Sequence, residues 1–291
     1  MFGSRSHLWR VIAGRVRGAA HIRQGLPNQD ALAFSPRRKS GPPLILTLAD
    51  GHGSPASFRS ALGAHMAVGS ALSQIIKIAK LDQKEQRDSI LSHWKESLPE
   101  QIVIGWQQQA AEHLSAHPFT DEEWQGLKEK GMSRHALALQ VNPLIAYGTT
   151  LLAVLVMPET VYFLHLGDGD MLIVAESGEV YRPFPPDERF IANETTSMCL
   201  PQAWKEMRST ALSITACHTA LILASTDGYA NSFRDEVAFF KAGRDFLTLQ
   251  HEYGIPFIRR RLCGWLRQTS RSGSGDDISL GILYHPDADE M

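Results

Sequence analysis

Residues 44–53 read LILTLADGHG, and this stretch decides how the rest of the chain is organised. A short apolar run that ends at a glycine is typical of a buried strand followed by a tight turn. The pattern places Asp50 at the end of that strand, and Gly51 allows the backbone to approach whatever the carboxylate binds. An Asp-Gly pair by itself more often marks an ordinary turn. The functional interpretation therefore depends on whether other acids occupy equivalent places.

A helix is predicted directly after this turn. Apolar side chains recur at helical spacing from Phe58 to Ile76, which indicates one apolar helix face. Ser54 is a typical N-cap residue, and Pro55 is favoured at the first position of a helix. Strand, acidic turn and helix together form a layout that holds one carboxylate in a fixed place.

The composition limits the classes of protein to which the chain can belong. It has 291 residues, a hydrophobic fraction of 43% and a net charge of −2, as in an ordinary globular protein with little attraction to nucleic acid or anionic membranes. Its three cysteines lie far apart and indicate neither a disulfide framework nor a metal site. The sequence has no signal-peptide pattern and no apolar run of about 18 residues. We expect a cytoplasmic protein that binds neither nucleic acid nor membrane.

Short apolar segments separated by turn residues predict an antiparallel β structure. Strand patterns cover residues 8–17, 31–34, 44–49, 147–156, 161–166, 171–175, 179–181, 211–215, 220–224 and 278–284, and helical patterns cover 236–250 and 256–268. Strict alternation of strand and helix is absent. The sequence thus predicts an α+β fold of antiparallel sheets with helices packed outside, rather than a doubly wound parallel sheet.

Residues 80–142 differ in character from the rest of the chain. They are polar, with helical spacing in places, and contain Trp94, Trp106 and Trp124, which we expect to pack between helices. We interpret 1–291 as a single domain in which 80–142 is a helical insertion that flanks the site and contributes to substrate choice. Residues 187–208 are expected to form a loop or flap, and residues 21–27 are expected to form a loop.

Five aspartates, Asp50 among them, lie at a strand edge or in a glycine-bearing turn beside a strand. They are Asp30, Asp50, Asp168, Asp227 and Asp276. Clustered carboxylates raise one another's pKa unless cations neutralise them. Oxygen ligands without a Cys or His cluster favour Mg²⁺ or Mn²⁺. Two such ions about 3.5–4 Å apart activate water for in-line hydrolysis of a phosphate ester, and no cysteine in a C-x₅-R pattern offers a nucleophile.

Six motifs, in order, carry a resemblance to a known family. They are Asn28-Gln29-Asp30, Asp50-Gly51-His52-Gly53, Tyr147-Gly148-Thr149-Thr150, Leu166-Gly167-Asp168, Ser225-Thr226-Asp227-Gly228 and Gly275-Asp276-Asp277-Ile278-Ser279. Together they resemble the metal-dependent protein phosphatase 2C family over nearly the whole chain except about 80–142. The resemblance implies two antiparallel β-sheets packed as a sandwich and flanked by helix pairs, in four layers α-β-β-α. It also implies hydrolysis of phosphoserine and phosphothreonine in proteins.

The resemblance further implies a role for each matching residue. Two metal ions, and a third that is bound more weakly, would be held by Asp50, the Gly51 carbonyl, Asp227, Asp276 and, for the third ion, Asp168. Asp30 would orient metal-bound water from behind. His52 would be the general acid that protonates the leaving seryl oxygen, a role that its ordinary pKa near 6.5 suits.

The chain departs from the family pattern at several positions. Gln29 stands where the family usually has a glutamate ligand, and its uncharged amide is either a weaker ligand or a structural group. The position of the arginine that binds the substrate phosphate is Gly25, so Arg23 is the nearest substitute. Asp170 is expected to add negative charge near the site. Asp277 replaces a common asparagine and is either a ligand or a turn residue.

The sequence therefore predicts a Mg²⁺- or Mn²⁺-dependent serine/threonine phosphatase whose substrate is a phosphoprotein linked to a Ser/Thr kinase. Two other functions stay open at this point. One is a non-catalytic module that binds phosphopeptides or serves as a scaffold, for which Gln29 and the missing arginine would be signs of decay. The other is a metal-dependent hydrolase of a small phosphorylated metabolite. The oligomeric state is not indicated.

Overall fold

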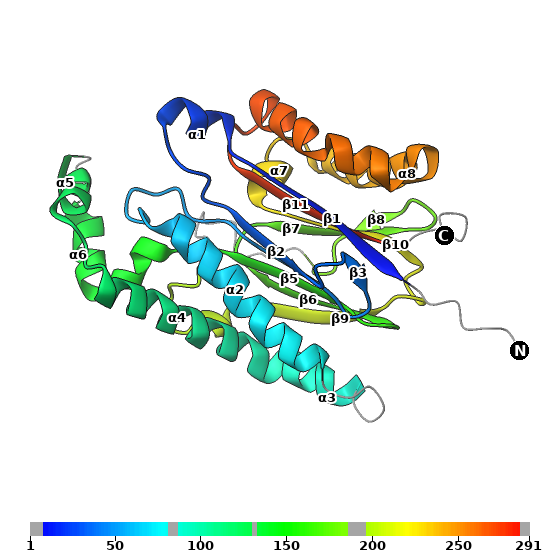
Figure 1. The fold of residues 1–291 in the computed structure, drawn as a ribbon, viewed down its shortest axis with the longest axis horizontal. Coiled ribbons are helices and arrows are strands. Elements are labelled where there is room, and N and C mark those ends of the chain that lie inside the picture. Colours follow the sequence, from blue (N-terminus) through cyan, green and yellow to red (C-terminus); the bar gives the residue numbers. More distant parts are fainter. Residues whose placement is uncertain (1–7, 81–86, 130–132, 186–195, 286–291) are drawn as a thin grey trace, which may run out of the picture.

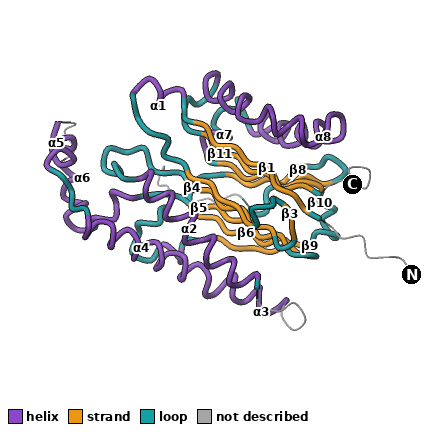
Figure 2. The backbone as a smooth tube through the Cα atoms, viewed as in Figure 1, coloured by secondary structure: helices purple, strands orange, loops and turns teal. Residues whose placement is uncertain are grey.

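The computed structural model describes residues 8–80, 87–129, 133–185 and 196–285. Two antiparallel sheets lie face to face, and long helices cover the outer face of each (Figure 1). The helix and strand layers are seen edge-on in Figure 2. The predicted α+β sandwich with four layers, α-β-β-α, is therefore confirmed.

The first sheet has six strands. Their spatial order is β3 (Ser40–Gly41), β1 (Trp9–Val16), β11 (Ile278–Tyr284), β10 (Thr219–Ser225), β7 (Asp170–Ala175) and β8 (Val180–Tyr181). The first and last long strands of the chain pair along their whole length, from Arg10 opposite Tyr284 to Val16 opposite Ile278. This pairing brings the two ends of the described chain into one sheet.

The second sheet has five strands. Their order is β2 (Ala31–Ser35), β4 (Leu44–Ala49), β5 (Leu151–Val156), β6 (Thr160–Leu166) and β9 (Arg208–Ser213). Side chains alternate between the two faces of β4, because a strand has a period of two residues. Leu44, Leu46 and Leu48 enter the core between the sheets, whereas Ile45 and Ala49 pack against the helices. Both faces of β4 are buried, which explains its unbroken apolar sequence.

The helices form the two outer layers. Over the five-stranded sheet lie α2 (Ser60–Ala79) and α4 (Leu98–Ala116), and over the six-stranded sheet lies α8 (Glu236–Ser272). The last of these is two helices joined at Gly254, whose φ of 70° and ψ of 168° are not helical. The shorter elements are α1 (Ala19–Gln24), α3 (Arg87–Ser92), a π-helical turn (His93–Ser97), α5 (Asp121–Glu129), α6 (Ser133–Val141), α7 (Asp227–Ala230) and 3₁₀ turns at Pro143–Tyr147 and Ala203–Lys205.

The helical character predicted for 80–142 is confirmed, and two of its tryptophans belong to the core. Trp94 and Trp106 are fully buried, and their indole N–H groups donate to the carbonyls of Phe163 and Gly63 at 3.0 and 2.9 Å. Helix α4 thus forms half of the outer layer over the five-stranded sheet. The division of the chain into one domain with an insertion stays a prediction. Of the loop or flap predicted at 187–208, residues 187–195 lie outside the described residues, and the remainder contains the 3₁₀ turn Ala203–Lys205 and ends at the start of β9.

Two local predictions are wrong. Helix α2 begins at Ser60, not after Ser54, because residues 54–57 close a turn in which the Ser57 N–H donates to the Ser54 carbonyl at 2.9 Å. The segment after Gly18 is the helix α1 rather than a loop. The Gly275 carbonyl accepts from Ala20 N–H at 2.8 Å, so this helix start is satisfied by a residue that is distant in the sequence. No helix in the described ranges is long and apolar enough to cross a membrane.

Glycines 63 and 69 of α2 provide a matched test of this packing. A Cβ at Gly63 would lie 1.8 Å from the Tyr147 carbonyl oxygen, whereas a Cβ at Gly69 would meet nothing within 4 Å. We expect Gly63→Ala to lower the free energy of unfolding by about 1–3 kcal/mol or more, since α2 must move away from the 3₁₀ turn Pro143–Tyr147. We expect Gly69→Ala to raise it by about 0.5–1 kcal/mol through helix propensity. Urea denaturation measures both, and equal effects would contradict the predicted close contact.

Candidate functional site

The predicted acids come together at one edge of the sandwich, at the end where α1 and α7 lie (Figure 1). Asp50 follows β4, Asp168 follows β6 and Asp227 follows β10, while Asp30 precedes β2 and Asp276 lies just before β11. Antiparallel strands place the end of one beside the start of the next, so these positions share one edge. The convergence predicted from strand-end placement is therefore present in the fold.

Asp50 is held through its backbone by the Thr-Thr pair before β5. Its N–H donates to Thr150 Oγ1 at 3.0 Å, and its carbonyl accepts from Thr150 N–H at 2.8 Å and from Thr149 Oγ1 at 2.7 Å. Gly51 is buried, and a Cβ there would lie 2.8 Å from the carbonyl oxygens of Gln29 and Ser60. These contacts fix the main chain and leave the Asp50 carboxylate for the site.

Asp30 is fully buried between the two sheets. Its Oδ2 accepts from Thr226 Oγ1 at 2.8 Å, and the same hydroxyl accepts from Ser279 N–H at 2.9 Å. Its Oδ1 has no hydrogen-bond partner. The chain of contacts joins the start of β2 to the ends of β10 and β11, so Asp30 links the sheets as well as facing the site.

Asp227 and Asp276 come from the six-stranded sheet. Asp227 opens α7, and its Oδ2 accepts from Asn231 Nδ2 at 3.0 Å, whereas its Oδ1 is buried without a partner. Asp276 is about half exposed, with a side-chain exposure of 48%, and its Oδ1 accepts from Asp277 N–H at 2.8 Å. Both therefore keep oxygen atoms for a further partner.

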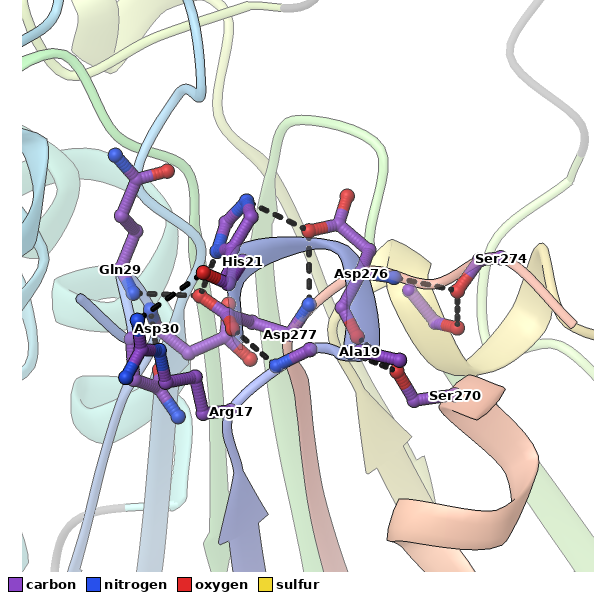
Figure 3. Close-up of polar contacts among 12 residues, drawn as sticks. Arg17, Ala19, His21, Gln29, Asp30, Ser270, Ser274, Asp276 and Asp277 are labelled. Carbon is purple, nitrogen blue, oxygen red and sulfur yellow. Dashed lines mark hydrogen bonds and ion pairs between the residues drawn. The ribbon is translucent and has the colours of Figure 1, made fainter. Parts of the chain in front are cut away.

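Asp277 is the site residue whose role the sequence left undecided. Its Oδ1 accepts from Gly18 N–H at 2.6 Å, and its Oδ2 accepts from Gln29 N–H at 2.6 Å and from His21 Nδ1 at 2.9 Å (Figure 3). It is 2% exposed. Asp277 is thus a clamp that ties β1, α1 and the start of β2 to β11. Sequence spacing gave no sign of these contacts, which span about 250 residues.

The carboxylates repel one another strongly. Burial raises the pKa of Asp50 well above its ordinary value, and the charges of Asp30, Asp227 and Asp276 raise it further. Burial raises the pKa of Asp30 to about 8, with Asp277 adding to the effect and the hydrogen bond from Thr226 opposing it. Burial also raises the pKa of Asp227, and the charges of Asp168 and Asp276 add to that shift. The clustered carboxylates therefore lack enough positive charge to balance them.

Divalent metal ions fit this donor set. Among the described residues, the buried oxygens without a hydrogen-bond partner include Oδ1 of Asp30, Oδ1 of Asp227 and Oε1 of Gln29. Carboxylate, carbonyl and amide oxygens are the ligands that Mg²⁺ and Mn²⁺ prefer, and a cation removes the repulsion that otherwise forces protonation. Gln29 is fixed by its backbone, since its carbonyl accepts from Gly51 N–H at 3.2 Å. Whether its amide binds metal stays a prediction.

His52 and Asp168 lie across the site from the buried acids. The His52 N–H donates to the Gly148 carbonyl at 3.0 Å, and its ring is half-buried. Burial lowers the pKa of His52, and the charge of Asp168 opposes that shift. Asp168 is exposed in the turn between β6 and β7, and its charge also raises the pKa of Asp227. The charge of Asp168 therefore acts both on His52 and on Asp227, one of the clustered acids.

Two expectations about charge near the site have different outcomes. Asp170 does not add negative charge there, because Arg182 binds both of its carboxylate oxygens at 2.6 and 3.1 Å. The sequence offered no sign of this pair. Arg23 is exposed on α1, two residues after His21, so its predicted role as phosphate anchor stays a prediction.

A family model described as protein phosphatase 2C matches residues 17–267. No curated protein matches the chain.

Several solved structures share the fold. The catalytic domain of the serine/threonine phosphatase PstP, in complex with two manganese ions, has 16% identity and a TM-score of 0.59, and the alignment covers 96% of this chain and 99% of that one. Stp1 from Staphylococcus aureus has 14% identity over 94% of both chains, with a TM-score of 0.56. PppA from Pseudomonas aeruginosa has 16% identity over 95% of this chain and 97% of that one, with a TM-score of 0.55. At these identities the similarity establishes the fold.

The raised carboxylate pKa values predict an unusual stability profile for the metal-free chain. Folded Asp30 and Asp50 hold protons that the unfolded chain releases above pH 3.8, so the free energy of unfolding falls as the pH rises towards 8. Burial lowers the pKa of His165. That shift makes the free energy of unfolding rise with pH, but only below about pH 6.5.

We therefore expect the melting temperature in EDTA to be lower at pH 8.5 than at pH 6.5. Addition of Mn²⁺ should raise the melting temperature more at pH 8.5 than at pH 6.5. Asp30→Asn should flatten the dependence in EDTA. A melting temperature that rises with pH in EDTA would contradict the charge assignment.

Proposed function

The chain belongs to the protein phosphatase 2C family of metal-dependent serine/threonine phosphatases, and from that premise we propose how its residues divide the work. The convergence of the buried carboxylates carries this proposal, because a set of acids that repel one another has a use only if it binds cations. Asp50, the Gly51 carbonyl, Asp227 and Asp276 would hold two ions, Mg²⁺ or Mn²⁺, and Asp168 would help to hold a third. When bound, such ions activate water and neutralise charge on phosphoryl oxygens.

His52 would supply the proton to the leaving group. In the hydrolysis, the phosphorus–oxygen bond to the serine or threonine breaks, and the departing oxygen must gain a proton. The Gly148 carbonyl fixes the backbone of His52 beside Asp168. A phosphate dianion in the site would favour the protonated imidazole, because an opposite charge nearby stabilises the charged form. Asp30, buried and bonded to Thr226, would orient the attacking water.

The substrate is a phosphoprotein, and we propose that a Ser/Thr kinase produces it. The chain would act as one domain over 1–291, in which 80–142 contributes to substrate choice and Arg23 contacts the substrate phosphate. Deletion of α5 and α6 in a folded protein tests the contribution of this segment, and an unchanged preference among phosphopeptides would contradict it.

The non-catalytic alternative has no specific observation in its favour. Asp50, His52, Asp227 and Asp276 are all present, and the contacts that position them are intact. Gln29 replaces a carboxylate, but its backbone still holds the Gly51 turn.

Removal of a ligand carboxylate should abolish metal-dependent hydrolysis. We expect Asp50→Ala and Asp227→Ala to lower kcat/KM for p-nitrophenyl phosphate by about 100-fold or more, because charge stabilisation by bound metal contributes several kcal/mol. EDTA should stop the wild-type reaction. Asp245→Asn is the control, since Asp245 pairs with Lys241 on the surface of α8. Wild-type rates that are indifferent to the chelator would rule out this function.

His52 is tested by varying the leaving group. A seryl oxygen needs a proton as it leaves, whereas a nitrophenolate leaves readily without one. We expect His52→Gln to lower the rate on a phosphoserine peptide by about 10²–10⁴-fold and to affect p-nitrophenyl phosphate much less. Equal losses on the two substrates would contradict the role of His52 as general acid.

A further inference from the structure

His21 joins the candidate metal centre from a segment that the sequence analysis treated as a loop. It lies in α1, and its Nε2 is 3.5 Å from Oδ1 of Asp276, while its Nδ1 is 2.9 Å from Oδ2 of Asp277 (Figure 3). The three side chains offer ligand atoms within 4.8 Å of one another. The His21 imidazole therefore lies between the buried carboxylate of Asp277 and the carboxylate of Asp276, which is already assigned to the metal centre.

The hydrogen bonds determine which ring nitrogen of His21 carries the proton. Asp277 accepts two backbone N–H groups, from Gly18 and Gln29, both at 2.6 Å. A carboxylate in that setting is an acceptor, so His21 Nδ1 donates to it. In the neutral imidazole, which is the form that binds metals, the lone pair is then on Nε2, the nitrogen that faces Asp276.

The same contacts favour an orienting role for Asp277 over a role as metal ligand. Both of its oxygens are engaged by donors, and it is 2% exposed. Asp277, His21 and Asp276 are therefore not a separate site of three equivalent ligands. Instead, the Asp277 carboxylate bonds to one ring nitrogen of His21, and the other ring nitrogen faces Asp276. The same arrangement is found at metal-ligating histidines, where a carboxylate fixes the orientation of the ring and raises its basicity.

We propose that Nε2 of His21 is a ligand of the divalent ion that Asp276 holds, with Asp277 as the carboxylate that orients the ring. A second observation points to a cation here. Asp30 lies beside Asp277, is fully buried and has an Oδ1 without a hydrogen-bond partner. The inference rests on the proposed metal centre and adds a nitrogen to a donor set that otherwise consists of oxygens.

A nitrogen ligand changes the metal preference of the site. Mg²⁺ favours oxygen ligands, whereas Mn²⁺ accepts imidazole more readily and later transition metals do so still more. His21 should therefore shift the preference from Mg²⁺ towards Mn²⁺.

Pulsed electron paramagnetic resonance on the Mn²⁺-loaded full chain tests the assignment directly, because it detects the coupling of a directly bound ¹⁴N nucleus. We expect this coupling in the wild type and its loss in His21→Gln. His135→Gln is the matched control, since His135 is exposed on α6, and it should keep the signal. Calorimetry should show Mn²⁺ binding weakened by about 10-fold or more in His21→Gln, with a smaller change for Mg²⁺.

Asp277→Asn provides a second variant that keeps the His21 side chain but changes the group that orients its ring. An asparagine amide can donate to Nδ1 and move the ring proton to Nε2, which should remove the ¹⁴N coupling. Bound Mn²⁺ without ¹⁴N coupling in the wild type, or with unchanged coupling in His21→Gln, would overturn the proposal and leave the proposed function standing. Absence of Mn²⁺ binding would contradict the metal centre itself. The wild-type spectrum decides the matter even if a variant fails to fold.

Discussion

Mutual repulsion among carboxylates is the constraint on which this structure depends. Burial raises the pKa values of Asp30, Asp50 and Asp227, and the charges of neighbouring aspartates raise each of them further. A fold gains nothing in stability from such an arrangement, because the acids would be better solvated apart. The arrangement is useful only when cations are bound. The rest of the molecule is therefore a scaffold that keeps these acids together.

The scaffold does so by cross-linking the two sheets at the edge where the acids lie. Thr226 bonds to Asp30 across the sandwich, and Asp277 bonds to Gly18 and Gln29. Both links use buried hydrogen bonds, and the two that Asp277 accepts are short, at 2.6 Å, as is usual for bonds to a carboxylate. The apolar core between the sheets brings the strands together, and these polar links determine how their ends face one another.

The helical layer over the five-stranded sheet reaches the site through Arg59. This arginine is buried at the start of α2, binds Glu123 of α5 through two bonds of 2.8 Å, and donates to Tyr147 Oη at 2.8 Å. Gly148, directly after Tyr147, accepts the His52 N–H. A path of packed residues thus connects α5 with the turn that carries His52. The pairing keeps the buried guanidinium charge compensated, which a buried ion requires.

The sequence by itself determined the elements whose signals are local. Apolar runs that end in Asp-Gly, such as 44–51, indicated the buried strands and the acids at their ends, and the order of the motifs indicated the layered sandwich. The tertiary structure alone decided the start of α2, the helix at Ala19–Gln24, the neutralisation of Asp170 by Arg182, and the positions of His21 and Asp277. Except for the start of α2, which follows the turn at residues 54–57, each of these depends on a partner that local sequence patterns do not identify, from 12 residues away for Arg182 to 256 residues away for His21 and Asp277. Periodicity reports which face of an element is apolar, but only the packed chain determines which polar groups meet.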